Sequence, residues 1–462
     1  MRTVILSDLH LGNGGPYDIF AGGEELPALL DTLVSSPTRV VLNGDTFDFL
    51  LNEDPLALDV SQAVRQAGDL VAHPPTSEVM AALGRVLQAG GEVCITVGNH
   101  DLELALPQVQ TVLRNALQQP HVISQRLSFP VGNEPLRFQV GGVGILVVHG
   151  EQVDNFNRVD QDALLARTVD PSTLFHYPPG SLLVKSLLNP LKVREGMRYM
   201  DLLKPDIEGA ILTALGANPA ALKVLLTPDT LRFFWRAFKN RRLRSAYSGG
   251  EEPSEWEGLG LRISDAGLTK PEAEAFARML NASGSASFDG DDLLDQARLK
   301  LVREGLKLYA KARREWVGQY AKVHREWVGQ KGVAYFELAP EAEELAEAQR
   351  LVRKYGGRAV VVGHTHSARW KQESGYVFAN TGTWIWLLRM PAPDASDDEW
   401  RDFILELQDN PSLAPDKQRL ALLERHFTCV EVEPRTSGGA TMRLAEWKQG
   451  ELHTLSEATL SP

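Results

Sequence analysis

TVILSDLH, at residues 3–10, decides the fold, because a short apolar run ends there in two polar side chains, Asp8 and His10. Runs rich in Val and Ile favour buried strands. Four more such runs end abruptly in Gly, Asp, Asn or His, at 39–42, 93–97, 144–148 and 358–362. Helix-like stretches at 25–34 and 76–89 separate the first three runs. This alternation predicts an α/β fold with functional side chains at the carboxyl ends of the strands.

Short strand candidates also follow Gly363, at 376–379, 428–433 and 441–445. They predict a second sheet that closes the fold, so that the expected architecture is a two-sheet α/β sandwich flanked by helices.

The segment 156–354 does not continue this alternation of strand-like and helix-like stretches. Apolar residues recur at three- and four-residue spacing between 202 and 215, which is typical of helices. We therefore predict a large, mainly α-helical insertion at 156–354 within a discontinuous α/β domain formed by 1–155 and 355–462. Inside the insertion, REWVGQ at 314–319 recurs at 325–330, an offset of 11 residues or about three helical turns. We interpret the repeat as a tandem duplication that lengthens an exposed helix.

The composition is that of an ordinary globular protein, with 43% hydrophobic and 23% charged residues in a chain of 462. A net charge of −12 disfavours broad binding to nucleic acid or acidic lipid. The two cysteines, Cys94 and Cys429, argue against a disulfide framework or a thiolate zinc cluster. No window reaches the ~18 uninterrupted apolar residues of a membrane-spanning helix, and the basic flank of a signal peptide is missing. We expect a cytoplasmic protein that is at most peripheral to a membrane.

Five predicted strand ends present metal-ligand side chains in a fixed order. The motifs are Asp8-Leu9-His10, Gly44-Asp45-Thr46-Phe47-Asp48, Gly98-Asn99-His100-Asp101, His149-Gly150 and Gly363-His364-Thr365-His366. A single Asp after a strand is commonly a helix cap, but all five motifs follow strands that one sheet edge can bring together. Oxygen and imidazole ligands without thiolate suit Mn, Fe, Zn or Co better than calcium.

The order and spelling of these motifs resemble the calcineurin-like metallophosphoesterases, whose pattern is D-x-H, G-D-x-x-D, G-N-H-D/E, H and G-H-x-H. The resemblance covers about residues 1–155 and 355–390, including the turn Asn380-Thr381-Gly382-Thr383. It implies a phosphoester hydrolase with a dinuclear centre of two divalent ions, Mn²⁺ foremost and Fe, Zn or Co as alternatives. It also implies that a metal-bound hydroxide attacks the phosphorus.

The same resemblance implies a role for each motif residue. Asp8, His10 and His366 bind one ion, Asn99, His149 and His364 bind the other, and Asp45 bridges them. His100 lies beside the leaving-group oxygen as an acid or charge stabiliser, and Asp101 orients it. Asp48 is expected to fix a ligand rather than to bind metal. Simple loop capping is a nearly equal alternative for both Asp48 and Asp101.

Within the superfamily, protein phosphatases carry Arg after the second Asp of their motif, whereas Phe49 follows Asp48 here. UDP-2,3-diacylglucosamine pyrophosphatases look similar around Asp8 and His364, although they typically have Arg where His100 stands. The substrate is therefore expected to be a phosphodiester or pyrophosphate that is lipid-linked or nucleotide-linked. The alternatives are a DNA or RNA phosphodiesterase, which the acidic balance disfavours, and a non-catalytic scaffold of the same fold for a protein partner.

A basic, aromatic stretch within the insertion combines apolar area with positive charge. It suits a lid over an amphiphilic phosphorylated substrate, or contact with an anionic membrane. A helical subdomain that buries its own aromatic residues is the equally weighted alternative. The candidate lid residues are Phe234, Trp235, Arg241 and Arg242.

Overall fold

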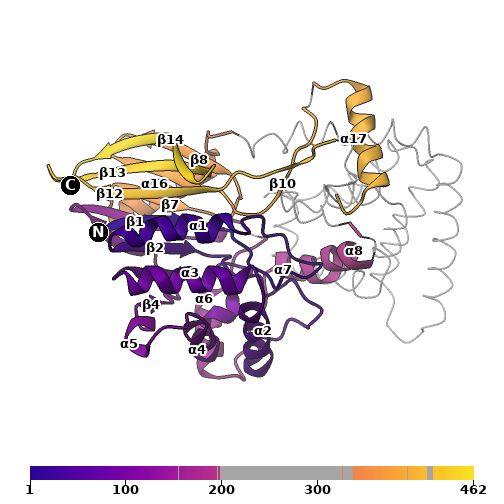
Figure 1. Cartoon of the computed structure of the whole chain (residues 1–462), viewed down its shortest axis with the longest axis horizontal. Coiled ribbons are helices and arrows are strands. Elements are labelled where there is room, and N and C mark those ends of the chain that lie inside the picture. Colours follow the sequence, from indigo (N-terminus) through magenta and orange to yellow (C-terminus); the bar gives the residue numbers. More distant parts are fainter. Residues whose placement is uncertain (155, 195, 198–324, 326–336, 393, 414–419) are drawn as a thin grey trace, which may run out of the picture. The chain divides into compact units, whose positions relative to one another are not determined.

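The computed structural model describes residues 1–154, 156–194, 196–197, 325, 337–392, 394–413 and 420–462 (Figure 1). Two compact units divide the chain. The first contains Met1–Ser181, Ala334–Leu387 and Arg425–Pro462, and the second contains Leu182–Val333 and Leu388–Glu424. Most of the expected insertion, including the lid candidates and nearly all of the REWVGQ repeat, lies outside the described residues.

A seven-stranded sheet in the order β14-β13-β12-β1-β2-β3-β4 forms one layer of the first unit. The first three strands of the chain run parallel, whereas β12 runs antiparallel to β1 and pairs Thr3 with Val432. The strands are β1 (Arg2–Leu6), β2 (Thr38–Asn43), β3 (Glu92–Thr96), β4 (Leu127–Ser128), β12 (Thr428–Pro434), β13 (Ala440–Lys448) and β14 (Glu451–Leu460).

A five-stranded sheet in the order β5-β6-β7-β9-β8 forms the second layer. Its strands β6, β7 and β9 run parallel to one another. The strands are β5 (Leu136–Val140), β6 (Val143–Val147), β7 (Ala359–Val362), β8 (Ala368–Glu373) and β9 (Tyr376–Thr381).

The strands near the end of the chain join a different sheet from the one expected. We predicted that the strands at 428–433 and 441–445 belong to the second sheet, but they extend the first sheet beyond β1. The physical reason is that β2 covers only one edge of β1, so the backbone groups of the other edge need an antiparallel partner.

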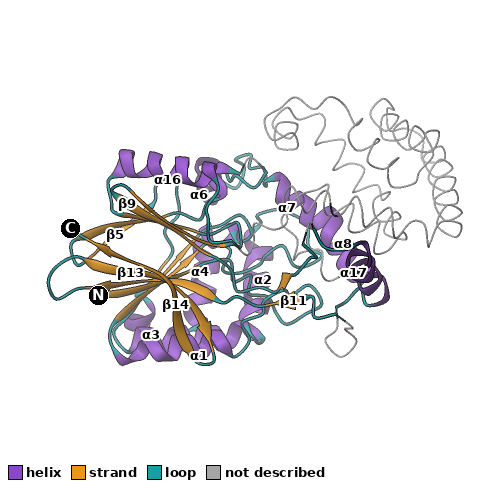
Figure 2. Ribbon diagram, turned by 90° about the horizontal axis from the view of Figure 1, so that it is seen from above, coloured by secondary structure: helices purple, strands orange, loops and turns teal. Residues whose placement is uncertain are grey.

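Alternating side chains explain why two sheets stack between helices. On β1, Val4 and Leu6 pack with α1 and α3, whereas Ile5 points to the other sheet. On β7, Val361 contributes to the core between the sheets, and Val360 packs toward α16. The layers are therefore α/β/β/α, with α1 and α3 on one side and α16 on the other (Figure 2). This confirms the predicted two-sheet α/β fold.

Further helices lie on the segments of the chain that connect the strands. In the described part of the chain, the α-helices are α1 (Glu25–Thr32), α2 (Val60–Ala72), α3 (Thr76–Gln88), α4 (Pro107–Ala116), α5 (His121–Ser124), α6 (Gln161–Val169), α7 (Pro179–Leu183), α8 (Asn189–Arg194), α16 (Ala342–Tyr355) and α17 (Asp397–Asp409). Short turns of other helix types are η1 (Leu33–Ser35), η2 (Leu102–Ala105), η3 (Glu151–Val153) and η4 (Val184–Leu188), and β10 (Leu387–Leu388) pairs with β11 (Leu423–Glu424).

Trp384 ties the turn after β9 to the end of β1. It is fully buried, its ring stacks 4.7 Å from that of Phe427, and its indole N–H donates to the carbonyl of Thr428 at 3.0 Å. Its backbone N–H donates to the carbonyl of Asp8 at 3.1 Å. The ring therefore fills the core and anchors the turn whose backbone N–H contacts the candidate ligand Asp8.

We expect Trp384→Ala to lower the free energy of unfolding by about 3–5 kcal/mol, because it leaves a large cavity and an unpaired carbonyl. Trp384→Phe should lose less, since it keeps the stacking. Urea unfolding followed by far-ultraviolet circular dichroism measures both. A loss below about 1 kcal/mol for the alanine variant would contradict this packing role.

Candidate metal centre

The candidate ligands lie where strands of both sheets end. Asp8 and His10 follow β1, Asp45 follows β2, and Asn99 follows β3, all in the seven-stranded sheet. His149 follows β6, and His364 and His366 follow β7, in the five-stranded sheet. Because these strands are parallel within each sheet, their carboxyl ends meet at one edge.

Two groups of these side chains are close enough to hold an ion. Asp8, His10 and His366 form one group, and Asp45, His149 and His364 form the other, with their ligand atoms within 4.8 Å of one another in each group. In the first group, His366 Nε2 lies 3.3 Å from Asp8 Oδ1 and 3.2 Å from His10 Nε2.

Asp45 lies between the two groups. Its Oδ2 is 3.3 Å from His149 Nε2 and 3.9 Å from His10 Nε2. The other oxygen, Oδ1, accepts a hydrogen bond from the backbone N–H of His100 at 2.8 Å. One carboxylate oxygen therefore faces both groups, while the second oxygen anchors the loop after β3.

The charges of the buried side chains favour cation binding at the candidate metal centre even in the metal-free chain. Burial opposes ionisation of Asp45, but the neighbouring His149 holds the pKa of this carboxyl well below its usual range. Burial likewise opposes protonation of His149, yet Asp45 raises the pKa of its imidazole well above the usual value. The buried carboxylates thus require positive charge nearby, which imidazolium or a metal ion can provide.

Several buried atoms of ligand type lack a partner. In the part of the chain that the structure describes, Asp8 Oδ1, Asn99 Oδ1 and His149 Nε2 make no well-aligned hydrogen bond. His149 Nδ1 lies 2.8 Å from the carbonyl oxygen of Asn43, so this nitrogen carries a hydrogen, and in the neutral ring Nε2 keeps its lone pair for a metal ion. Buried lone pairs without donors are costly, and divalent ions would satisfy them. The residues present therefore fit divalent metal.

Asp48 holds two histidine rings with one oxygen. Its Oδ2 lies 2.8 Å from His10 Nδ1 and 3.0 Å from His100 Nδ1. Burial opposes ionisation of Asp48, but His100 and His10 hold its pKa below the usual range. The carboxylate is therefore anionic and fixes the orientation of both rings.

Asp101 caps the ligand loops and does not orient His100, so the first of its two expected roles is wrong. Its oxygens accept hydrogen bonds from the backbone N–H groups of Thr46 at 2.8 Å and Gly98 at 2.6 Å. Burial, assisted by the charge of Asp45, raises the pKa of Asp101 to about 8. Asp101 thus clamps the loops after β2 and β3 together, and the carboxylate that contacts the His100 ring is Asp48.

The backbone around the ligands is conformationally demanding. Five candidate ligands adopt the left-handed region that non-glycine residues rarely occupy: Asp8 (φ 53°), His10 (φ 48°), Asp45 (φ 48°), His364 (φ 69°) and His366 (φ 57°). Such strain persists only where the surrounding structure enforces it, and it clusters at functional sites.

Glycines of the motifs leave room for ligands from other strands. A Cβ at Gly98 would collide with the carboxylate and backbone nitrogen of Asp45, and one at Gly363 would collide with Ser7 and Asp8. Asn380 supports the same edge, since its amide donates to the carbonyl of Gly363 at 2.8 Å.

Sequence reasoning missed two acidic residues beside His149. Asp154 Oδ2 lies 3.1 Å from His364 Nε2, and Glu151 is fully buried with neither carboxylate oxygen hydrogen-bonded among the described residues. The available signal was the presence of two acids within five positions of His149. The lid candidates Phe234, Trp235, Arg241 and Arg242 lie outside the described part of the chain.

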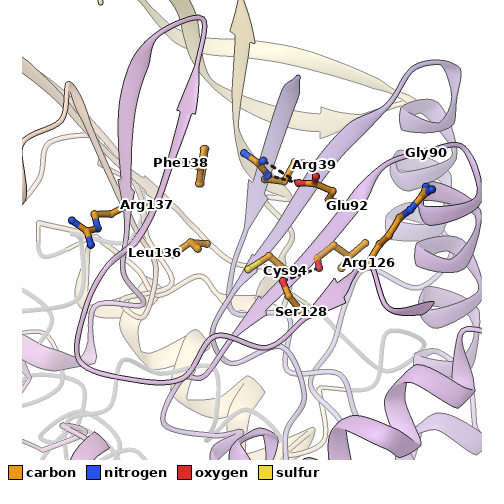
Figure 3. A pocket seen from close by; sticks show the side chains of 10 residues that line it. Arg39, Gly90, Glu92, Cys94, Arg126, Ser128, Leu136, Arg137 and Phe138 are labelled. Carbon is orange, nitrogen blue, oxygen red and sulfur yellow. Dashed lines mark hydrogen bonds and ion pairs between the residues drawn. The ribbon is translucent and has the colours of Figure 1, made fainter. Parts of the chain in front are cut away.

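A separate pocket of about 530 Å³ lies away from these ligands (Figure 3). Its lining includes Arg39 and Glu92, which stand at the amino-terminal ends of β2 and β3, whereas the ligands follow the carboxyl ends. Arg39 pairs with Glu92 at 2.9 Å and lies 4.9 Å from the centre of the Phe138 ring. Burial raises the pKa of the Cys94 thiol on the same wall.

An α/β/β/α sandwich whose strand ends gather carboxylate, amide and imidazole ligands defines a metal-dependent hydrolase of the phosphoesterase type. Comparison with family models agrees, because residues 1–194 match the calcineurin-like phosphoesterases. The match over residues 1–194, together with the two ligand groups, supports the calcineurin-like metallophosphoesterase superfamily and a metal-dependent phosphoesterase. No curated protein matches the chain. Among the described helices, none has the length and apolar character needed to cross a membrane.

We expect Gly98→Ala to weaken divalent-metal binding and to lower phosphoesterase activity by about 10²-fold, because Asp45 must move away from the added methyl group. Isothermal titration with Mn²⁺ and hydrolysis of bis-p-nitrophenyl phosphate measure the two effects. Gly68→Ala in α2 is the matched control, since its Cβ meets no atom within 4 Å. This control should keep activity, and equal behaviour of the two variants would contradict the steric argument.

Proposed function

We propose that the chain hydrolyses a phosphodiester or pyrophosphate bond at a dinuclear metal centre. The observation that carries this proposal is the convergence of unpartnered, buried ligand atoms from both sheets beside His100. In this proposal one ion is held by Asp8, His10 and His366. The other is held by Asn99, His149 and His364, and Asp45 bridges them.

The bound ions would supply Lewis acidity toward the phosphoryl oxygens and activate water. Asp8 and Asp45 offset part of their charge, while the neutral ligands leave an excess of positive charge for an anionic substrate. Two observations support this assignment: Asp45 Oδ2 faces histidines of both groups, and both carboxylates are buried.

His100 is proposed to donate a proton to the leaving-group oxygen. Asp48 supports this role, because its anionic carboxylate lies 3.0 Å from His100 Nδ1 and favours the protonated imidazole. The same oxygen of Asp48 contacts His10, so the proton donor and a metal ligand share one anchor. We assign Asp101 to holding the two ligand loops rather than to the chemistry.

A lipid-linked or nucleotide-linked diphosphate is the substrate class that we favour. The likeness of residues 7–11 and 363–366 to the UDP-2,3-diacylglucosamine pyrophosphatases supports this choice. His100, where those enzymes typically carry Arg, distinguishes this chain from them.

The proposal is tested by loading the purified protein with Mn²⁺ and measuring two properties, bound metal and turnover. The substrate panel contains bis-p-nitrophenyl phosphate, nucleotide diphospho-lipids, cyclic nucleotides, single-stranded DNA and simple monoesters. We expect two ions per chain and preference for a diester or diphosphate. Preference for DNA would identify a nuclease, and a metal-free, inert protein would identify a scaffold; either outcome would overturn the proposal.

We expect Asp45→Asn to reduce turnover more than loss of any single histidine ligand, because a bridging carboxylate serves both ions and screens their repulsion. Metal content measured by plasma emission should fall at both sites. Asp69→Asn, which changes the same charge on the exposed side of α2, should keep wild-type content and rate. A variant at Asp45 that retains both ions and more than about a tenth of the rate would refute the bridging role.

We expect His100→Gln to keep both ions and to slow hydrolysis of substrates with poor leaving groups by roughly 10²–10⁴-fold, the range for a lost general acid. Substrates with good leaving groups should lose less, because they need no protonation. A series of aryl phosphodiesters of increasing phenol pKa measures this difference. Equal losses along the series would argue against proton donation.

A further inference from the structure

Asp154 stands beside a candidate ligand, yet it belongs to none of the five metal-ligand motifs. It ends η3, five residues after His149, and its Oδ2 lies 3.1 Å from His364 Nε2. The Asp154 side chain is about one-third exposed, with 31% of its surface accessible, and the His364 side chain is largely buried at 8%. The contact thus links the end of β6 to the end of β7.

From this contact we infer that Asp154 is a positioning residue for the second ion. It accepts the hydrogen of His364 Nε2 and thereby leaves Nδ1 as the metal-binding atom of this ring. The inference rests on the proposed function in one respect, namely that His364 is a ligand. A carboxylate that holds the second nitrogen of a ligating histidine fixes its tautomer and raises its basicity.

Two other candidate ligands, His149 and His10, show the same division of ring nitrogens. His149 directs Nδ1 to the carbonyl of Asn43 at 2.8 Å and Nε2 toward Asp45. His10 directs Nδ1 to Asp48 at 2.8 Å and Nε2 toward His366 and Asp45. Each ring has an acceptor on one nitrogen and turns the other to the centre. In His364 the roles of the two nitrogens are exchanged: Nε2 faces its acceptor, Asp154, and Nδ1 is left for the metal ion.

Asp154 is itself held in place by its own loop. Its Oδ2 accepts from the side-chain amide of Asn157 at 2.7 Å, and its Oδ1 accepts from the backbone N–H of Phe156 at 2.8 Å. Asn157 is 4% exposed and packs against Gly180, where an added Cβ would collide with its amide oxygen. The backbone N–H of Gly180 donates to the carbonyl of Phe156 at 3.0 Å.

The loop that holds Asp154 packs against a residue near the end of this part of the first unit. Gly180 lies one residue before Ser181, the last residue of this part of the first unit. The contacts that hold Asp154 therefore extend to the segment that ends at Ser181. Asp154 contacts both His364 and the loop that packs against Gly180, so it is a specific target for mutation.

The test compares Asp154→Ala and Asp154→Asn with Asp160→Asn. Asp160 lies in the same segment and caps α6 through the N–H of Ala163 at 3.0 Å, so its replacement removes the same charge without touching His364. Titration of metal-free protein with Co²⁺, followed by absorption, reports each site. We expect Asp154→Ala to weaken one of the two sites by about 10–100-fold and to change its spectrum, with Asp154→Asn intermediate. Asp160→Asn should match the wild type.

Nitrogen-15 resonances of selectively labelled histidine provide a readout that needs neither metal nor turnover. In metal-free wild-type protein the neutral His364 should carry its hydrogen on Nε2, and Asp154→Ala should abolish this preference. Hydrogen on Nδ1 in the wild type, or equal weakening of both cobalt sites, would overturn the inference. A wild-type chain that binds no Co²⁺ would instead refute the metal centre of the proposed function, while the tautomer would still decide the role of Asp154.

Discussion

Two buried carboxylates impose the constraint on which the rest of the site depends. Asp8 and Asp45 are 0% and 1% exposed, and burial of an anion is costly unless positive charge or hydrogen bonds compensate it. The chain surrounds them with histidines rather than with Lys or Arg, which leaves lone pairs directed inward. Protonated imidazoles can balance the charge in the metal-free protein, and the same rings can release their protons and bind divalent ions. The two buried carboxylates make the cation-free site unfavourable. The same carboxylates bind the divalent ions that a phosphoesterase needs.

The sheets determine which ligands can meet. Neither sheet alone supplies a full set, because the acidic ligands and Asn99 follow strands of one sheet whereas His149, His364 and His366 follow strands of the other. Close contact of the two edges requires glycines at Gly98 and Gly363, where any side chain would displace a ligand. Five ligands at this edge also have left-handed backbone conformations, which non-glycine residues rarely adopt. The close approach of the ligands is thus accompanied by conformational strain in the backbone.

Much of this arrangement could be predicted from local sequence, because each motif is a strand end followed by a ligand type. The ranges of α1 and α3 and the parallel strands β1, β2 and β3 follow from hydrophobic periodicity. The sheet to which β12 and β13 belong could not be predicted, since pairing with β1 depends on partners more than 420 residues apart. The acceptor of the His100 ring was assigned to Asp101 by adjacency, whereas the fold places Asp48 there. Asp154 was missed because its partner, His364, is 210 positions away and no spacing rule connects them.

The position of β1 has a consequence for biosynthesis. This apolar strand lies inside the seven-stranded sheet, between β2, which the ribosome delivers early, and β12, which begins at Thr428. At about 5–20 residues per second, of the order of a minute separates the two deliveries. During that interval one edge of β1 offers unpaired backbone groups to any other extended chain, a recognised route to misassembly. The nascent protein therefore needs either protection by a chaperone or transient cover from its own later segments.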